Sequence, residues 1–132
     1  MKKLTLTQIT EKIKAKKFQK FDLIVAIGKD GIMPASLLKH FLDIPVEVIW
    51  LNYRNKENKP IREEPILKKP LNKRLKLMKN KNILIVDSIS KTGKTLEKAK
   101  EVLKDNRVKT FVINGKADYS LFKFKECIDW PW

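Results

Sequence analysis

Two short apolar runs limit the fold of this chain more than any other feature. Residues 23–27 and 83–86 are continuously apolar and of strand length, and strands of this kind lie inside a parallel sheet that is covered on both faces. Each run is followed by polar or glycine residues and then by a helical pattern. Strands that alternate with helices in this way predict an α/β fold with a doubly wound, mainly parallel sheet.

The rest of the chain continues this alternation. Helices are expected after Thr5, where Gln8 completes a capping box, from about Pro34, and over the apolar stripe of Leu96, Ala99 and Leu103. Further strands are expected at residues 46–51 and 108–113, and a short helix within 71–79. We expect the strand at 83–86 to end at Asp87. No repeat or linker divides the sequence, so residues 1–132 form one predicted domain.

The loop at residues 88–95 is typical of an anion site. It follows a buried strand and opens a helix, so that backbone N–H groups and the positive end of the helix dipole meet there. Ser90, Thr92 and Thr95 add hydroxyl donors, and Gly93 permits close approach of a phosphate. An N-capped helix without a ligand is the alternative interpretation. A triphosphate-binding loop would need a glycine at Ser88, and the dinucleotide pattern of spaced glycines is missing.

Composition narrows the possible partners and the location. The chain has 30 Lys and Arg against 15 Asp and Glu, a net charge of +15, which favours anionic partners such as a phosphorylated small molecule or nucleic acid. The single cysteine, Cys127, excludes an internal disulfide and a cysteine-based zinc site. No apolar stretch is long enough to cross a membrane, and no signal-peptide pattern follows Met1. We therefore expect a cytoplasmic protein.

Three segments together resemble the type I phosphoribosyltransferases, nearest the small xanthine-guanine and hypoxanthine members. Residues 83–96 resemble the phosphoribosyl-diphosphate-binding signature of that family, and residues 26–35 resemble its pyrophosphate loop. Lys116, followed by residues 127–132 with their Pro-Trp ending, is similar to the base-binding end. The resemblance implies transfer of 5-phosphoribosyl from phosphoribosyl diphosphate to a purine-like base, with Mg²⁺ as cofactor, pyrophosphate as product and purine salvage as the context. By fold analogy, a homodimer is expected.

The resemblance also implies roles for individual residues. Catalytic roles fall to Asp87, Lys29 and position 91, with Asp87 on a ribose hydroxyl and indirectly on the metal. The phosphoribosyl ligands would be Ser88, Ser90, Thr92, Gly93, Lys94 and Thr95. The pyrophosphate loop would be Gly28, Lys29, Asp30 and Gly31, with a cis peptide at Gly28–Lys29. The base would meet Lys116, Ile128 and Trp130 in a tail formed by residues 114–132.

Residues 52–82 differ from the rest of the chain. This segment holds eleven basic and three acidic residues, a net charge of +8 out of the total of +15. Long connections of this kind are lids, binding loops or disordered segments. We interpret the segment as a flexible basic lid that closes over the reacting ribose, with Arg54, Arg62 and Lys69 as its ligand-binding residues. A solvated basic loop is the alternative, because lysines usually face water.

Three positions depart from the family pattern. Ser88 stands where a second acid is common, and Cys127 replaces an aromatic residue that would stack on the base. Lys91 stands where purine-using members often have an aspartate that handles the base proton, and lysine normally keeps its own proton near neutrality. These departures leave an alternative function open: a non-catalytic member of the same fold that senses nucleotides or binds RNA.

Overall fold

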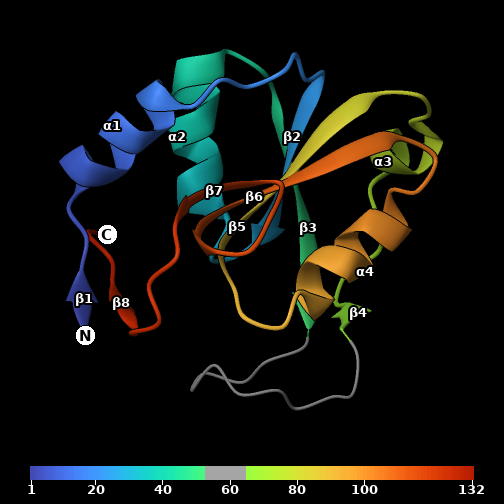
Figure 1. Cartoon of the computed structure of the whole chain (residues 1–132). Helices are drawn as coiled ribbons and strands as arrows, with labels where there is room; N and C mark the ends of the chain where they lie inside the picture. Colours follow the sequence, from blue (N-terminus) through green and yellow to red (C-terminus); the bar gives the residue numbers. More distant parts are fainter. Residues whose placement is uncertain (53–64) are drawn as a thin grey trace.

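The computed structural model describes residues 1–52 and 65–132, and its centre is a six-stranded sheet in the order β4-β3-β2-β5-β6-β7 (Figure 1). The strands are β2 (Leu23–Gly28), β3 (Val46–Asn52), β4 (Ile66–Leu67), β5 (Asn82–Ser90), β6 (Arg107–Gly115) and β7 (Tyr119–Phe122). All neighbours pair in parallel except β3 and β4, which are antiparallel. This arrangement confirms the predicted doubly wound, mainly parallel sheet.

Helices cover both faces of the sheet (Figure 1). They are α1 (Leu6–Ala15), α2 (Ile32–Leu42), α3 (Lys73–Leu77) and α4 (Lys94–Val102). The first two share one buried cluster with alternate residues of the strands, and the other two share a second cluster with the intervening residues. Two-sided burial explains why β2 and β5 are apolar without alternation. Residues 23–27 and 83–86 are all at most 5% exposed.

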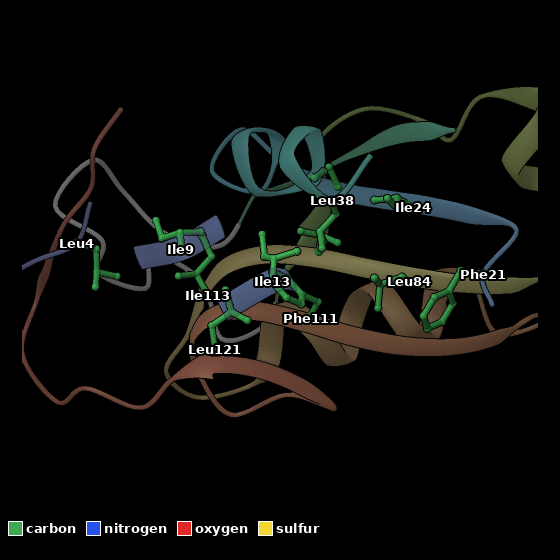
Figure 2. Packing of buried hydrophobic residues seen from close by; sticks show 13 residues of the cluster. Leu4, Ile9, Ile13, Phe21, Ile24, Leu38, Leu84, Phe111, Ile113 and Leu121 are labelled. Atoms are coloured by element: carbon green, nitrogen blue, oxygen red, sulfur yellow. The ribbon is translucent and has the colours of Figure 1, made fainter. Parts of the chain in front are cut away.

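The first cluster contains Phe111 on β6, the largest fully buried side chain among the described residues. Figure 2 shows Ile9 and Ile13 of α1 and Leu38 of α2 pointing toward the side chains of the sheet. The start of α1 has the expected capping box, in which Thr5 and Gln8 exchange hydrogen bonds. The predicted short helix within residues 71–79 is confirmed as α3.

Four short strands were absent from the sequence prediction. In addition to β4 and β7, a separate two-stranded parallel sheet joins β1 (Lys2–Lys3) to β8 (Ile128–Asp129). This pairing brings the two termini side by side (Figure 1). Strands of two to four residues carry little periodic signal, and the partners of β1, β4 and β8 lie far away in the sequence. None of the helices in the described residues is long and apolar enough to span a bilayer.

The order of the strands determines where a ligand can bind. The chain passes from β2 to β3 on one side of the sheet and from β5 to β6 on the other, so the direction of winding reverses between β2 and β5. Ligands of doubly wound folds bind at such a reversal, beyond the carboxyl ends of the strands. The connections β2–α2 and β5–α4 both begin at this point.

Candidate active site

Strand β5 extends further than the sequence predicted. Pairing with β6 continues past Asp87 to the final pair, Ser90 with Gly115, so the prediction that the strand ends at Asp87 is wrong. Polar residues have a low strand preference, but the long neighbouring strand supplies backbone partners that outweigh it. The connection to α4 is therefore only residues 91–93.

This short connection leads directly into the amino end of α4. Gly93 has a positive φ of 82°, and no atom lies within 4 Å of where its Cβ would be. No side chain caps α4 at this residue, although the Thr92 hydroxyl accepts a long hydrogen bond of 3.4 Å from the Lys94 N–H. The first backbone N–H groups of a helix lack partners within it, so the open end of α4 is suited to an anion.

The side chains around this connection differ in exposure. Lys91, Thr92 and Lys94 are exposed, whereas Ser90 and Thr95 are half-buried. Ser88 is only 4% exposed, within the sheet rather than in the connection, and its burial argues against direct contact with a ligand. Asp87 is half-buried, and its Oδ1 accepts a 2.8 Å hydrogen bond from the Ser88 N–H.

The loop that follows β2 lies against the end of β5. A Cβ atom on Gly31 would overlap the carbonyl oxygen of Val86, and the Gly31 N–H donates to the Ile27 carbonyl at 2.8 Å. Only glycine allows this approach. The Gly28–Lys29 peptide is cis, as the resemblance implied. This contact places the loop after β2 against the strand that leads into the predicted phosphate loop at residues 88–95.

The loop after β2 presents charged side chains to solvent and buries the glycine that follows them. Lys29 and Asp30 are both exposed, while Gly31 is buried. The Ile32 N–H donates to the Lys29 carbonyl at 3.0 Å, so the loop turns tightly into α2. The cationic side chain of Lys29 is therefore presented to solvent at the carboxyl edge of the sheet.

Trp50 and Lys69 extend this site toward β3. The Trp50 ring lies 2.8 Å from where a Cβ of Gly28 would be, and the Lys69 Nζ lies 4.8 Å from the centre of the same ring. The backbone holds them together, because the Lys68 N–H donates to the Trp50 carbonyl at 2.7 Å. Sequence reasoning missed Trp50 as part of this site. The lid candidates Arg54 and Arg62 lie outside the described residues.

A cavity of about 300 Å³ lies beside the connection between β5 and α4. Lysines contribute to both of its sides, with Lys91 from the connection and Lys116 from the end of β6. The other lining residues are Ser90, Thr92, Gly93, Leu96, Glu97, Lys100, Thr110, Ala117 and Asp118. The structure therefore brings the predicted base-binding Lys116 next to the predicted phosphate loop.

The other two predicted base-binding residues lie elsewhere. Ile128 is on β8 and pairs with Lys2, and Trp130 stacks on Trp132 with ring centres 5.5 Å apart. Both Ile128 and Trp130 pack against the cluster under α1 and α2. Neither of them lines the cavity that contains Lys116.

A buried asparagine anchors the start of this tail. The Asn114 side chain is part of a residue that is 2% exposed, and it donates to the Phe124 carbonyl at 3.1 Å and accepts from the Phe124 N–H at 2.8 Å. These two hydrogen bonds satisfy the backbone N–H and carbonyl of Phe124, which lies outside the strands. Sequence reasoning missed Asn114, because a single polar residue in an apolar strand gives no indication of its partner.

The described residues contain no group of three or more His, Cys, Asp or Glu side chains that could hold a metal ion by themselves. Asp87 directly follows Val86, which the loop after β2 contacts, and it precedes the connection to α4. Magnesium is commonly bound by one or two carboxylates together with phosphate oxygens of a substrate. Asp87 fits this second arrangement.

Comparisons with known proteins agree with this geometry. A purine phosphoribosyltransferase from Pyrococcus horikoshii is 30% identical, with a TM-score of 0.80 over 99% of this chain and 92% of that one. A hypothetical protein from Neisseria gonorrhoeae, solved with bound ppGpp, is 28% identical, with a TM-score of 0.77 over 99% and 89%. The fold is shared with a xanthine-guanine-hypoxanthine phosphoribosyltransferase from Helicobacter pylori, at 18% identity, a TM-score of 0.68, and coverage of 98% and 89%.

A search of curated proteins found no match. The model of the phosphoribosyl transferase domain, in contrast, matches residues 3–131, which is nearly the whole chain. Together with the doubly wound sheet, this match identifies the chain as a member of the phosphoribosyl transferase domain family.

Proposed function

We propose that this phosphoribosyltransferase transfers the 5-phosphoribosyl group to a ring nitrogen of a purine-like base. The observation that supports the proposal is the contact of Gly31 with the Val86 carbonyl, which puts the proposed pyrophosphate loop against the strand that leads into the proposed phosphate loop. One loop suits the 5-phosphate of phosphoribosyl diphosphate and the other its pyrophosphate. The purine phosphoribosyltransferase at 30% identity supports a purine as the acceptor.

The 5-phosphate would bind at the amino end of α4. Its proposed ligands are the backbone N–H groups of the β5–α4 connection and the side chains of Ser90, Thr92, Lys94 and Thr95. Gly93, which has open space at its Cβ position, would let the phosphate approach the backbone. The helix dipole adds to this attraction, since negative charge is favoured at a helix amino end.

The pyrophosphate would bind over the loop after β2. Exposed Lys29 and the cation of Lys69 over Trp50 would supply positive charge, and Asp30 would orient Lys29. As the bond from the anomeric carbon to pyrophosphate breaks, negative charge grows on the leaving group. Preorganised cations stabilise this charge more than they stabilise the ground state.

Asp87 would contact a ribose hydroxyl and, through it or directly, a magnesium ion held mainly by the diphosphate. Magnesium, when bound, would neutralise charge on the leaving pyrophosphate. Asp87 is held in place by its hydrogen bond from the Ser88 N–H. The neutral Ser88 contributes no second charge, so one carboxylate carries this role.

Lys116 would donate a hydrogen bond to an exocyclic oxygen of the base, because it follows β6 and lines the cavity beside the phosphate loop. Ile128 and Trp130 remain proposed base contacts from the tail. Since they do not line that cavity, they would contact the base from another side.

The direct experiment measures pyrophosphate release from phosphoribosyl diphosphate and magnesium with adenine, guanine, hypoxanthine and xanthine. Binding is measured separately: phosphoribosyl diphosphate with magnesium should raise the melting temperature, because a ligand of the folded state stabilises it. Pyrophosphate release with at least one base supports transfer. Binding without release from any base would overturn the proposed reaction.

A second function is favoured by one observation, the ppGpp in the Neisseria gonorrhoeae structure. This chain would then sense a guanine nucleotide that carries two diphosphates, which the two adjoining anion loops could hold. In that case ppGpp should raise the melting temperature in the absence of phosphoribosyl diphosphate, and no base should give turnover. RNA binding would instead weaken steeply with added salt.

A further inference from the structure

Lys91 and Lys116 follow directly after the ends of two neighbouring strands. The last pair between β5 and β6 joins Ser90 to Gly115, and each lysine is the first residue after its strand. Neighbouring parallel strands are about 4.8 Å apart, so the two lysines leave the sheet close together. Both side chains are exposed, and both line the same cavity of about 300 Å³.

The acids of this cavity already have partners. Its titratable groups are Lys91, Lys100, Lys116, Glu97 and Asp118. Glu97 forms an ion pair with Lys100 at 3.8 Å. Asp118 accepts hydrogen bonds from the backbone N–H and the hydroxyl of Thr110 at 2.9 and 3.0 Å.

Lys91 and Lys116, in contrast, form no ion pair with any residue in the described part of the chain. Two ammonium groups that share a cavity repel each other, and an anion between them removes this repulsion. The cavity is therefore better suited to a negatively charged group than to a neutral one.

We infer that Lys91 and Lys116 make this enzyme select a purine base that is already an anion near neutral pH, of which xanthine is the common example. This inference rests on the proposed function, because it assumes that a base accepts the phosphoribosyl group next to the phosphate loop. Hypoxanthine and guanine are neutral at that pH. Lys91 is the specificity-determining residue, since it provides positive charge where a carboxylate would repel the anion.

The balance of protons explains this preference. In the transfer, a ring nitrogen forms a bond to the anomeric carbon, and the bond from that carbon to pyrophosphate breaks, with its electron pair leaving on pyrophosphate. A neutral base must also lose a ring proton, which needs an acceptor. An anionic base has lost that proton in solution, so it needs no acceptor, and a lysine at position 91 no longer hinders the reaction.

The test compares kcat/KM for xanthine, hypoxanthine and guanine at several pH values below and above neutrality. With the native enzyme, xanthine should be favoured by about tenfold or more, a typical discrimination for one well-placed polar contact. Its kcat/KM should rise as the base ionises, and the corresponding rise for hypoxanthine should occur at more alkaline pH.

The variant Lys91→Asp should reverse this preference. Its carboxylate would repel an anionic base and accept the proton of a neutral one, so the xanthine-to-hypoxanthine ratio should fall by about tenfold or more. Lys104→Gln, an exposed lysine outside the cavity, removes a positive charge as a matched control and should leave the ratio unchanged. Melting temperatures check that both variants fold.

The outcomes separate the two proposals. Turnover of neutral bases at or above the rate for xanthine, with a ratio that Lys91→Asp leaves unchanged, would overturn the inference and keep the proposed function. A change confined to KM for phosphoribosyl diphosphate would also overturn it, because the lysines would then bind the sugar phosphate. No pyrophosphate from any base would overturn both.

Discussion

Gly115 contacts Ser90 so closely that a Cβ atom on the glycine would overlap the serine carbonyl oxygen. The same glycine has a positive φ of 122°, which side chains rarely adopt. This contact is the last pair between β5 and β6. It therefore sets where β5 ends and where the connection to α4 begins, together with the proposed phosphate site.

The first prediction is that Gly115→Ala weakens binding of phosphoribosyl diphosphate and lowers stability. The added methyl group must displace the Ser90 carbonyl and also adopt an unfavourable φ, at a combined cost of about 2–4 kcal/mol. Urea unfolding gives the stability, and a melting-temperature titration with phosphoribosyl diphosphate gives the binding. For stability alone, Gly93→Ala is the matched control, because Gly93 also has a positive φ but no atom within 4 Å of its Cβ position.

Gly93→Ala should lower the free energy of unfolding by only about 1–2 kcal/mol, because the left-handed backbone conformation is the only unfavourable feature for alanine there. If the two variants were equally destabilised, steric overlap at Ser90 would not be what positions the end of β5.

The second prediction concerns the tail. Asn114→Ala should lower the free energy of unfolding by about 1–3 kcal/mol, because it removes a buried side chain that hydrogen-bonds both backbone groups of the half-buried Phe124. Urea denaturation measures this loss. Lys123→Ala, an exposed neighbour in sequence, should change stability by no more than about 0.5 kcal/mol. Equal effects of the two substitutions would contradict an anchoring role for Asn114.

The sequence predicted those parts of the fold and site that depend on neighbouring residues. The apolar runs of β2 and β5 and the Thr5 capping box each contain their whole signal in a few consecutive positions. Local patterns also predicted two candidate anion loops, one after each of these strands. The order of strands and helices, with parallel pairing, further implied that these loops share one edge of the sheet.

The parts that the sequence did not predict depend on distant partners. Asp87–Ser90 lies in a strand only because β6 is long enough to pair with it. Lys2–Lys3 forms a strand only because the tail lies beside it. Trp50 lies within the strand predicted at residues 46–51, and only the fold brings its ring next to Gly28 and Lys69.

The third prediction is that Asp87→Asn lowers kcat/KM for phosphoribosyl diphosphate by about ten- to a hundredfold, as expected when a ligand or its support near a metal is lost. Asparagine keeps an oxygen that can accept from the Ser88 N–H, so the fold should be unaffected. The loss should grow when magnesium is limiting, which a magnesium titration of the rate measures. Asp105→Asn, at an exposed turn after α4, is the control for charge, and an equal loss in that variant would remove the special role of Asp87.

The fourth prediction separates two adjacent lysines. The Lys69 Nζ lies over the Trp50 ring, 4.8 Å from its centre, and this ring also covers Gly28 of the pyrophosphate loop. A cation held in this way needs little further ordering to bind pyrophosphate, so Lys69→Ala should raise KM for phosphoribosyl diphosphate by about tenfold. Lys68→Ala should have a much smaller effect, because the contact of Lys68 with Trp50 is made by its backbone N–H, which alanine retains.

Steady-state kinetics at two salt concentrations measure KM for phosphoribosyl diphosphate in both variants. Added salt should raise this KM more for the native enzyme than for Lys69→Ala, because the variant has one cation fewer to screen. Equal KM values for Lys69→Ala and Lys68→Ala would contradict this prediction. They would mean that only the total positive charge of the two lysines affects binding, and that the position of Lys69 over Trp50 does not.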